Sequence, residues 1–178
     1  RIVQKALPEV AEKEFILVDF PMTKDKEVLK AAWEKTAEET CRLIDAGKKV
    51  AFLTIGDPSV YATYHYIHRL VEQRGKKAEM ISGVPSFCSA AARLGISLGD
   101  GEEQIHIIPG SYGVEETTAL SGTRIYMKSG RELQHVKKVL KEEAACREKN
   151  GEELQVYAVT DCGLENEMVM RGLEEWPE

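Results

Sequence analysis

The sequence predicts an α/β fold, and two features of the chain support that prediction. Short apolar runs with the composition of strands alternate with longer stretches of helical periodicity, as in parallel sheets whose strands are joined by helices. The clearest run is Val50–Ile55, where six uncharged residues lead directly into Gly56-Asp57-Pro58. Ligands of open α/β sheets bind outside the carboxyl ends of the strands, so this turn is where we first expect chemistry.

The first part of the chain is expected to contain three strands and four helical segments. Residues 1–7 have the pattern of a helix end stopped by Pro8, and the strands are predicted at 15–20, 50–55 and 77–81. Helices are predicted at 23–46, at about 59–73 and at 87–94, and a glycine ends each of them or follows within two residues. Thr23 is the expected cap of the first long helix, with Asp25 in its first turn.

The second part of the chain continues the alternation with shorter elements. Strands are predicted at 104–108, 123–127, 154–160 and 167–170, and helices at 115–120 and 132–149. The segment from Pro109 to Gly113 has the composition of a linker. We therefore expect an N-terminal domain over residues 1–110 and a C-terminal domain over residues 111–178, each a truncated α/β unit.

Composition excludes several classes of function. The 178 residues carry 24 Lys and Arg against 30 Asp and Glu, a net charge of −6, with no basic run suited to nucleic acid. No apolar run reaches the roughly 18 residues of a membrane span, and no signal-peptide pattern appears. The four cysteines, Cys41, Cys88, Cys146 and Cys162, form no C-x-x-C pair, which argues against zinc and favours a reduced, cytoplasmic setting.

The candidate chemistry lies in the turns that follow the predicted strands. His65 and His68 lack the partners of a metal motif, and no nucleophile elbow or phosphate loop is present. The remaining candidates are the turns at 56–58, 83–86, 127–128 and 160–163, which together indicate a small-molecule cleft. Gly56 permits close backbone approach, Asp57 can cap the next helix or hold a ligand, and Pro58 suits a first helical position.

Three motifs follow one another along the chain: residues 52–63, which contain Gly-Asp-Pro-Ser-Val-Tyr, residues 82–96, which begin Ser-Gly-Val-Pro-Ser-Phe, and Tyr126-Met127-Lys128. They resemble the tetrapyrrole methylases, S-adenosylmethionine-dependent enzymes of corrin and sirohaem biosynthesis. Residues 20–25 and Ala31-Ala32-Trp33 are similar to the subgroup that methylates C20 of precorrin-2 or cobalt-factor II. The resemblance extends over nearly the whole chain, with the motifs in order.

The resemblance implies two α/β domains with the cofactor in the cleft between them, a tetrapyrrole substrate and a homodimer. The residues it implies for the cofactor site are Gly56, Asp57, Pro58, Val60, Tyr61, Ser86, Phe87, Met127 and Cys162. The many carboxylates of such a substrate call for local cations, and Arg93, Arg124, Lys128 and Arg131 are candidates or solvated surface charges. The resemblance names no catalytic proton acceptor.

Two departures from the family pattern matter. The expected first strand, with its Gly-Pro-Gly-Asp-like loop, does not occur in this sequence, and Ser82–Ser86 stands where many members have Pro-Gly-Val-Thr-Ser. The chain is therefore expected to be a fragment that lacks a sheet strand and part of the site. Two alternatives stay open: a family member that methylates another ring carbon, and a non-catalytic binding or interaction module.

Overall fold

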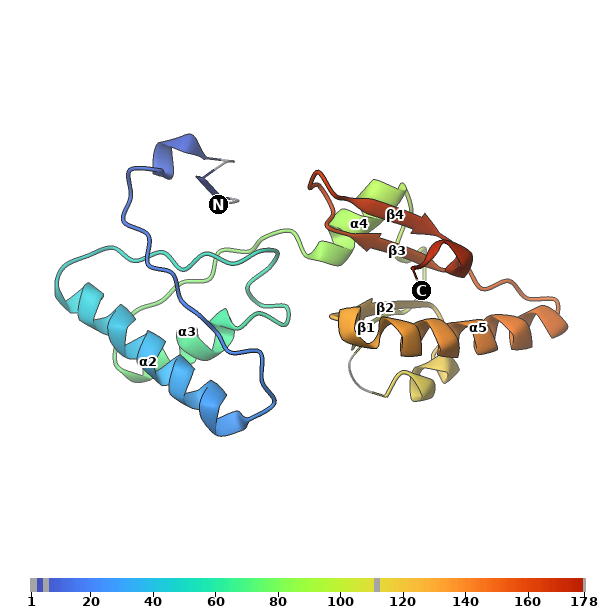
Figure 1. The fold of residues 1–178 in the computed structure, drawn as a ribbon, viewed down its shortest axis with the longest axis horizontal. Helices are drawn as coiled ribbons and strands as arrows, with labels where there is room; N and C mark the ends of the chain where they lie inside the picture. The colour runs from blue at the N-terminus through green and yellow to red at the C-terminus, as the bar shows by residue number, and fades with distance from the viewer. Residues whose placement is uncertain (1–2, 5–6, 111–112, 178) are drawn as a thin grey trace. The chain divides into compact units, whose positions relative to one another are not determined.

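The computed structural model describes residues 3–4, 7–110 and 113–177, and these form two compact units (Figure 1). The first unit runs to Ser82 and the second begins at Gly83. The expected boundary between residues 110 and 111 remains a prediction about the family's domains, and residues 111 and 112 of the expected linker lie outside the described residues. Likewise, most of the helix end expected at residues 1–7 falls on residues that are not described.

The first unit contains a short 3-10 turn, η1 (Pro8–Val10), and two helices, α2 (Lys26–Asp45) and α3 (Tyr64–Gln73). The sequence predicted α2 closely, but its cap is Asp25 rather than Thr23. The Asp25 side chain accepts the backbone N–H groups of Glu27 and Val28, which would otherwise have no partner in the first turn. The Thr23 hydroxyl instead accepts the N–H of Asp25 at 3.1 Å.

The core of the first unit lies between α2 and α3. Ala37 and Cys41 of α2 and Ile67 and Val71 of α3 are its buried residues. Phe20, Trp33, Ile44, Phe52, Leu70 and Ala78 are partly buried against them. The two helices thus hold together three distant parts of the chain, because Phe20, Phe52 and Ala78 each come from one of the segments predicted as strands.

These three segments do not form strands, which corrects the prediction for residues 15–20, 50–55 and 77–81. They lie against the helices on one side only, and apolar side chains on the other side are exposed: Leu17 by 94%, Ile55 by 81% and Ile81 by 82%. A parallel ladder normally forms where both faces of a sheet are covered. In these three segments, strand composition is not accompanied by strand pairing.

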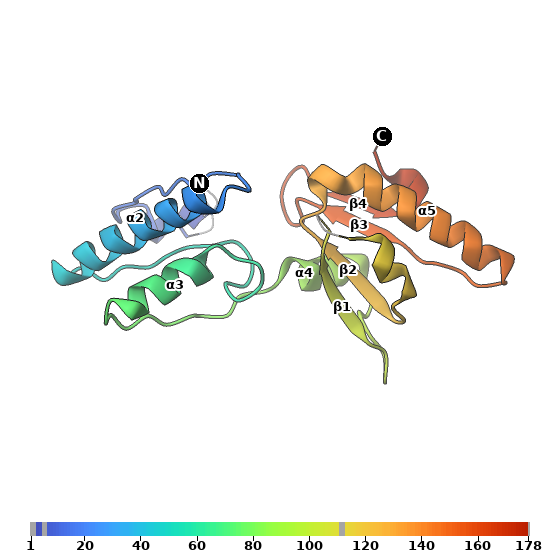
Figure 2. The same ribbon diagram turned by 90° about the horizontal axis from the view of Figure 1, so that it is seen from below.

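The second unit contains all the strands of the described residues (Figures 1 and 2). Helix α4 (Ser86–Leu94) comes first and ends at Gly95 in the left-handed conformation, as predicted. Strands β1 (Ile105–Pro109) and β2 (Thr123–Met127) pair in parallel, with Pro109 opposite Met127. Strands β3 (Tyr157–Thr160) and β4 (Met168–Arg171) pair antiparallel as a separate sheet. The short turns η2 (Glu115–Ala119), η3 (Gly130–Glu132) and η4 (Leu173–Glu175) and the helix α5 (Leu133–Lys149) complete the unit.

Helix α5 organises the core of the second unit. Its buried residues Val136, Val139 and Leu140 pack with Val114, Met170, Leu173 and Trp176. Tyr126 of β2 and Ala158 of β3 pack against this cluster, and Met170 of β4 belongs to it, so one core includes residues of both strand pairs. Figure 2 shows α5 beside the strands of this unit. The second unit is therefore a mixed α/β structure in which the predicted strands are paired.

Candidate functional site

The loop from Gly56 to Tyr61 is a compact turn rather than the start of a helix. Asp57 Oδ1 accepts the backbone N–H of Ser59 at 2.8 Å and its hydroxyl at 2.5 Å. The N–H of Val60 donates to Asp57 O at 3.2 Å. Pro58 is buried, and α3 begins only at Tyr64. The helix start expected near Ser59 is therefore wrong, because the Asp57 side chain fixes a local turn instead of capping α3.

Ser86 and Phe87 form the first turn of α4 in the second unit. Ser86 is exposed and Phe87 half-buried. The N-cap residue of this helix is Pro85, whose side chain forms no hydrogen bond with the N–H groups of the first turn. The positive end of a helix is a favourable place for an anionic group of a ligand.

Met127 ends β2 beside the end of β1. The N–H of Gly110 donates to Met127 O at 2.7 Å, which extends the pairing one residue beyond Pro109. A Cβ atom on Gly110 would lie 2.6 Å from the Cβ of Ser129, so no larger residue fits there without a shift. From the sequence, Gly110 is expected only as part of a linker. In the structure its backbone lies against Ser129 and bonds to the predicted site residue Met127, a position that favours glycine.

Cys162 lies in the loop between β3 and β4. Asp161 Oδ2 accepts Asn166 Nδ2 at 2.5 Å, and Glu167 Oε2 accepts the N–H of Gly163 at 2.7 Å. Arg93 at the end of α4 forms an ion pair with Glu167. The roles of Asn166 and Glu167 in this loop were not predicted from the sequence. The sequence does not indicate which residues polar side chains in a turn will bond to across the loop.

Non-glycine residues with strained backbone occur within two of the four predicted turns and three residues after a third. Among the described residues other than glycine, positive φ angles are found at Tyr61 (48°), Lys128 (58°) and Asp161 (49°). Tyr61 is a predicted site residue, Lys128 follows Met127, and Asp161 precedes Cys162. Left-handed backbone costs a non-glycine residue roughly 1–2 kcal/mol, and such residues cluster at functional sites. This coincidence is the structural observation that favours these turns as a site.

The predicted site residues divide between the two units. Gly56, Asp57, Pro58, Val60 and Tyr61 lie together on one turn of the first unit, and Ser86, Phe87, Met127 and Cys162 lie in the second. Within the second unit, α4 contacts the β3–β4 hairpin through Arg93 and through Arg171, which donates to Leu94 O at 2.9 Å. The assignment of these nine residues to one cofactor site remains a prediction.

Two of the candidate substrate-binding cations have structural partners. Arg124 donates to both carboxylate oxygens of Glu143, at 2.7 and 2.8 Å, and the two side chains are only 5% and 7% exposed. Arg93 pairs with Glu167. The Arg124 side chain is therefore buried rather than a surface cation. Lys128 and Arg131 are exposed next to the end of β2, and their role as substrate-binding cations remains a prediction.

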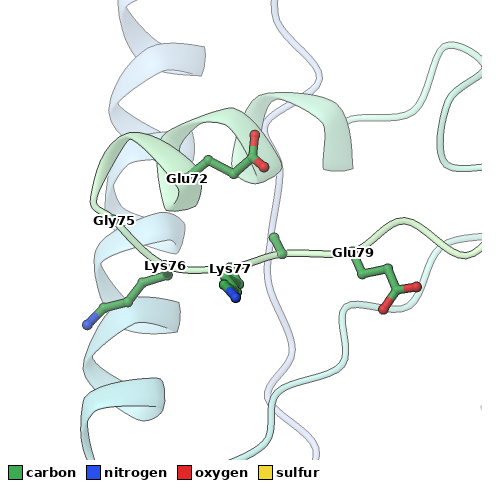
Figure 3. Close-up of a pocket in the computed structure, with 6 residues that line it drawn as sticks. Glu72, Gly75, Lys76, Lys77 and Glu79 are labelled. Carbon is green, nitrogen blue, oxygen red and sulfur yellow. The ribbon is translucent and has the colours of Figure 1, made fainter.

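A surface hollow in the first unit does not fit the expected site (Figure 3). It lies at the end of α3 and the start of the 77–81 segment, whereas the predicted turns follow the ends of such segments. Figure 3 shows Glu72, Lys76 and Glu79 pointing in different directions, and Lys76 pairs with Asp45. The hollow thus offers no convergent set of polar groups.

The described part of the chain contains neither a metal-binding cluster nor a membrane-spanning helix. There, no group of three or more His, Cys, Asp or Glu residues could hold a metal ion. His68 lies on α3 between Tyr64, whose hydroxyl is 3.3 Å from Nδ1, and Glu72, 3.4 Å from Nε2. Across residues 3–4, 7–110 and 113–177, no helix has the length and apolar character needed to cross a bilayer.

The sequence model of the Tetrapyrrole (Corrin/Porphyrin) Methylases matches residues 1–176. A "Probable cobalt-precorrin-2 C(20)-methyltransferase" of Methanocaldococcus jannaschii is 38% identical over 110 residues, which are 62% of this chain and 46% of that protein. A "Precorrin-2 C(20)-methyltransferase" of Sinorhizobium sp is 27% identical over 111 residues, 61% of this chain and 45% of the relative. A "Diphthine synthase" of Metallosphaera sedula is 34% identical over 92 residues, 52% and 32% of the two chains. The matches therefore span less than half the length of each relative.

Proposed function

Because the chain belongs to the tetrapyrrole (corrin/porphyrin) methylases, we propose that the full-length protein is an S-adenosylmethionine-dependent methyltransferase. The proposed reaction is methylation of C20 of precorrin-2 or cobalt-factor II in cobalamin biosynthesis. The observation that carries this proposal is the 38% identity over 110 residues to a relative named for C20 methylation of cobalt-precorrin-2. A cytoplasmic homodimer is part of the same proposal, by analogy with the family.

The residues of the strained turns fit the chemical groups of S-adenosylmethionine. Met127 is a half-buried, polarisable side chain suited to a flat adenine ring, and Gly56 and Gly110 allow close backbone approach. Asp57 and Ser59 hold the first turn in shape, with Pro58 buried beneath it and Val60 and Tyr61 following. Ser86, Phe87 and Cys162 complete the proposed set in the second unit.

The chain's contribution to the proposed reaction is to orient the donor and the acceptor. S-adenosylmethionine supplies an electrophilic methyl group, so the protein needs no metal or nucleophile of its own to activate it. The turns would hold the donor near the acceptor carbon, an effect of proximity and alignment that can supply several kcal/mol of the barrier reduction. Lys128 and Arg131 would face substrate carboxylates, beside the Met127 end of β2.

Calorimetric titration of the natural full-length protein with S-adenosylhomocysteine tests the cofactor site. Asp57→Ala removes the acceptor that fixes the first turn and is expected to weaken binding about tenfold, an effect of roughly 1.4 kcal/mol. Asp25→Ala is the matched control, because Asp25 Oδ1 also accepts a backbone N–H two residues on, at 2.9 Å, but at the start of α2. Equal loss in both variants, or in neither, would contradict the assignment of the turn to the site.

The identity of the methyl acceptor is the part of the proposal for which an alternative exists. The match to a protein named "Diphthine synthase" favours, as a second candidate, methyl transfer to a different acceptor. Within the family, methylation of another ring carbon is the nearer alternative. Incubation with precorrin-2 and with cobalt-factor II separates these outcomes, since neither alternative yields a C20-methylated product. A full-length protein that binds tetrapyrrole but not S-adenosylhomocysteine would instead be a binding module.

A further inference from the structure

Helix α4 connects two of the segments proposed to bind the cofactor. Its first turn carries Ser86 and Phe87, and its last turn contacts the β3–β4 hairpin (Figures 1 and 2). Arg93 forms an ion pair with Glu167, and Leu94 O accepts Arg171 at 2.9 Å. Nine residues of helix separate the two ends by roughly 12 Å. One rigid element therefore spans from the first segment to the loop that carries Cys162.

The Cys162 loop contains one non-glycine residue in the left-handed conformation. Asp161 has a φ angle of 49°, whereas the positive φ of 80° at Gly163 is ordinary for glycine. Glu167 closes the loop by accepting the N–H of Gly163 at 2.7 Å, and its side chain is only 14% exposed. The pKa of Glu167 is lowered first by this bond, then by Arg93, with a smaller contribution from a hydrogen bond with the Cys162 thiol. Glu167 thus interacts with Cys162 and with the backbone of Gly163, the two residues that follow Asp161.

We propose that Arg93 and Glu167 are positioning residues that hold the Cys162 loop in the conformation that binds S-adenosylmethionine. This inference rests on the proposed function. Arg93 comes from α4 and Glu167 from the end of the loop, so their contact ties the loop to the helix that carries Ser86. An ion pair whose Arg93 side chain is 58% exposed contributes little to global stability. Its effect is local, because a loop that is ordered only part of the time binds its ligand more weakly in proportion.

The test uses Arg93→Met and Glu167→Gln in the natural full-length protein, with two measurements. Hydrogen exchange at the amides of Gly163 and Leu164 reports the order of the loop without any ligand. Calorimetry with S-adenosylhomocysteine reports the affinity. We expect faster exchange at these amides, about tenfold weaker binding, and an unchanged melting temperature. With substrate, KM for S-adenosylmethionine should rise while kcat stays nearly constant.

Two controls separate positioning from a general loss of structure. Arg93→Lys keeps a cation at the same place and should restore most of the affinity. Arg42→Met removes a comparable exposed pair on α2, in which Arg42 Nε donates to Glu39 at 2.9 Å, and should change neither exchange at Gly163 nor affinity. Faster exchange with unchanged affinity would overturn the inference but not the proposed function. Absence of binding by the wild-type protein would overturn both.

Discussion

The two units of this chain differ in what became of their predicted strands. In the second unit, residues 105–109 and 123–127 pair in register, and α5 packs against Tyr126 of the second strand. In the first unit, residues 15–20, 50–55 and 77–81 are equally apolar but remain unpaired. They contact α2 and α3 through Phe20, Phe52 and Ala78, while Leu17, Ile55 and Ile81 are exposed.

An apolar run therefore forms a strand only where a partner strand and covering elements are present. A hydrophobic composition predicts that a segment is buried on both faces. It does not predict which other elements of the protein cover those faces. In the second unit, β1 and β2 pair although Ile105 and Ile107 of β1 are 47% and 40% exposed. In the first unit, Leu17, Ile55 and Ile81 are 94%, 81% and 82% exposed, and the segments that carry them have no strand partner among the described residues.

The largest expected contrast is between one ion pair in each unit. Glu143→Ala leaves Arg124 as a buried charge in the second unit, where the two side chains are 5% and 7% exposed, and should cost about 3–5 kcal/mol. Glu34→Ala breaks the Arg74 pair in the first unit, where exposure is 34% and 39%, and should cost about 1 kcal/mol or less. Urea unfolding measures both. Similar losses in the two variants would mean that the units do not differ in burial as described.

A second contrast uses apolar side chains. Leu140→Ala empties a position that is 3% exposed against the core of the second unit and should cost about 2–5 kcal/mol. Ile81→Ala changes a side chain that is 82% exposed in the first unit and should stay within about 0.5 kcal/mol. A loss above about 1 kcal/mol for Ile81→Ala in the full-length protein would show that this face is covered there.

A smaller effect concerns the one element of the first unit that the sequence predicted well. Asp25→Ala removes the side chain that accepts the N–H groups of Glu27 and Val28 and should cost about 1 kcal/mol. Thr23→Ala should cost less, because the Thr23 hydroxyl accepts only the N–H of Asp25. Thermal unfolding followed by circular dichroism ranks the two. The reverse ranking would restore Thr23 as the cap.

The smallest expected effect is a pH dependence in the second unit. The pKa of Glu167 lies below its ordinary value of 4.5, because the Gly163 N–H and Arg93 favour the carboxylate. The contribution of this contact is therefore complete above pH 4.5 and is lost as the pH falls through the lowered pKa. Carboxyl ¹³C NMR of Glu167 should show the low pKa, and Arg93→Met should raise it. A pKa that does not respond to Arg93→Met would remove the ion pair as a cause.

Local signals explain how much of the fold could be predicted. The helical periodicity and Gly47 located α2, and Gly95 located the end of α4, because a helix and its glycine cap are written in neighbouring residues. Strands β1 and β2 were predicted within a residue. The prediction of three strands in the first unit was wrong. Strand pairing depends on a partner strand elsewhere in the chain, and a local sequence pattern does not identify that partner. The start of α3 was wrong because Asp57 was free to cap either a helix or a turn.

In the candidate site too, features that depend on local sequence could be predicted, and features that depend on contacts between distant residues could not. The turns at the strand ends could be predicted from their motifs and positions. The strained backbone at Lys128 and Asp161 lies within two of those turns, and that at Tyr61 lies three residues after another. Glu167 and Gly110 could not be found from the sequence, because their importance comes from contacts with Gly163 and Ser129. The exclusion of Arg124 likewise needed its burial with Glu143.

The most direct test of the account is the position of a transferred methyl group. The natural full-length protein is incubated with S-adenosylmethionine labelled with ¹³C in its methyl group, together with precorrin-2 or cobalt-factor II. A C20-methyltransferase should yield a single ¹³C-methyl group on C20 of the product and no labelled product when the acceptor is omitted. A label on another ring carbon, or no transfer to either tetrapyrrole, would contradict the proposed function.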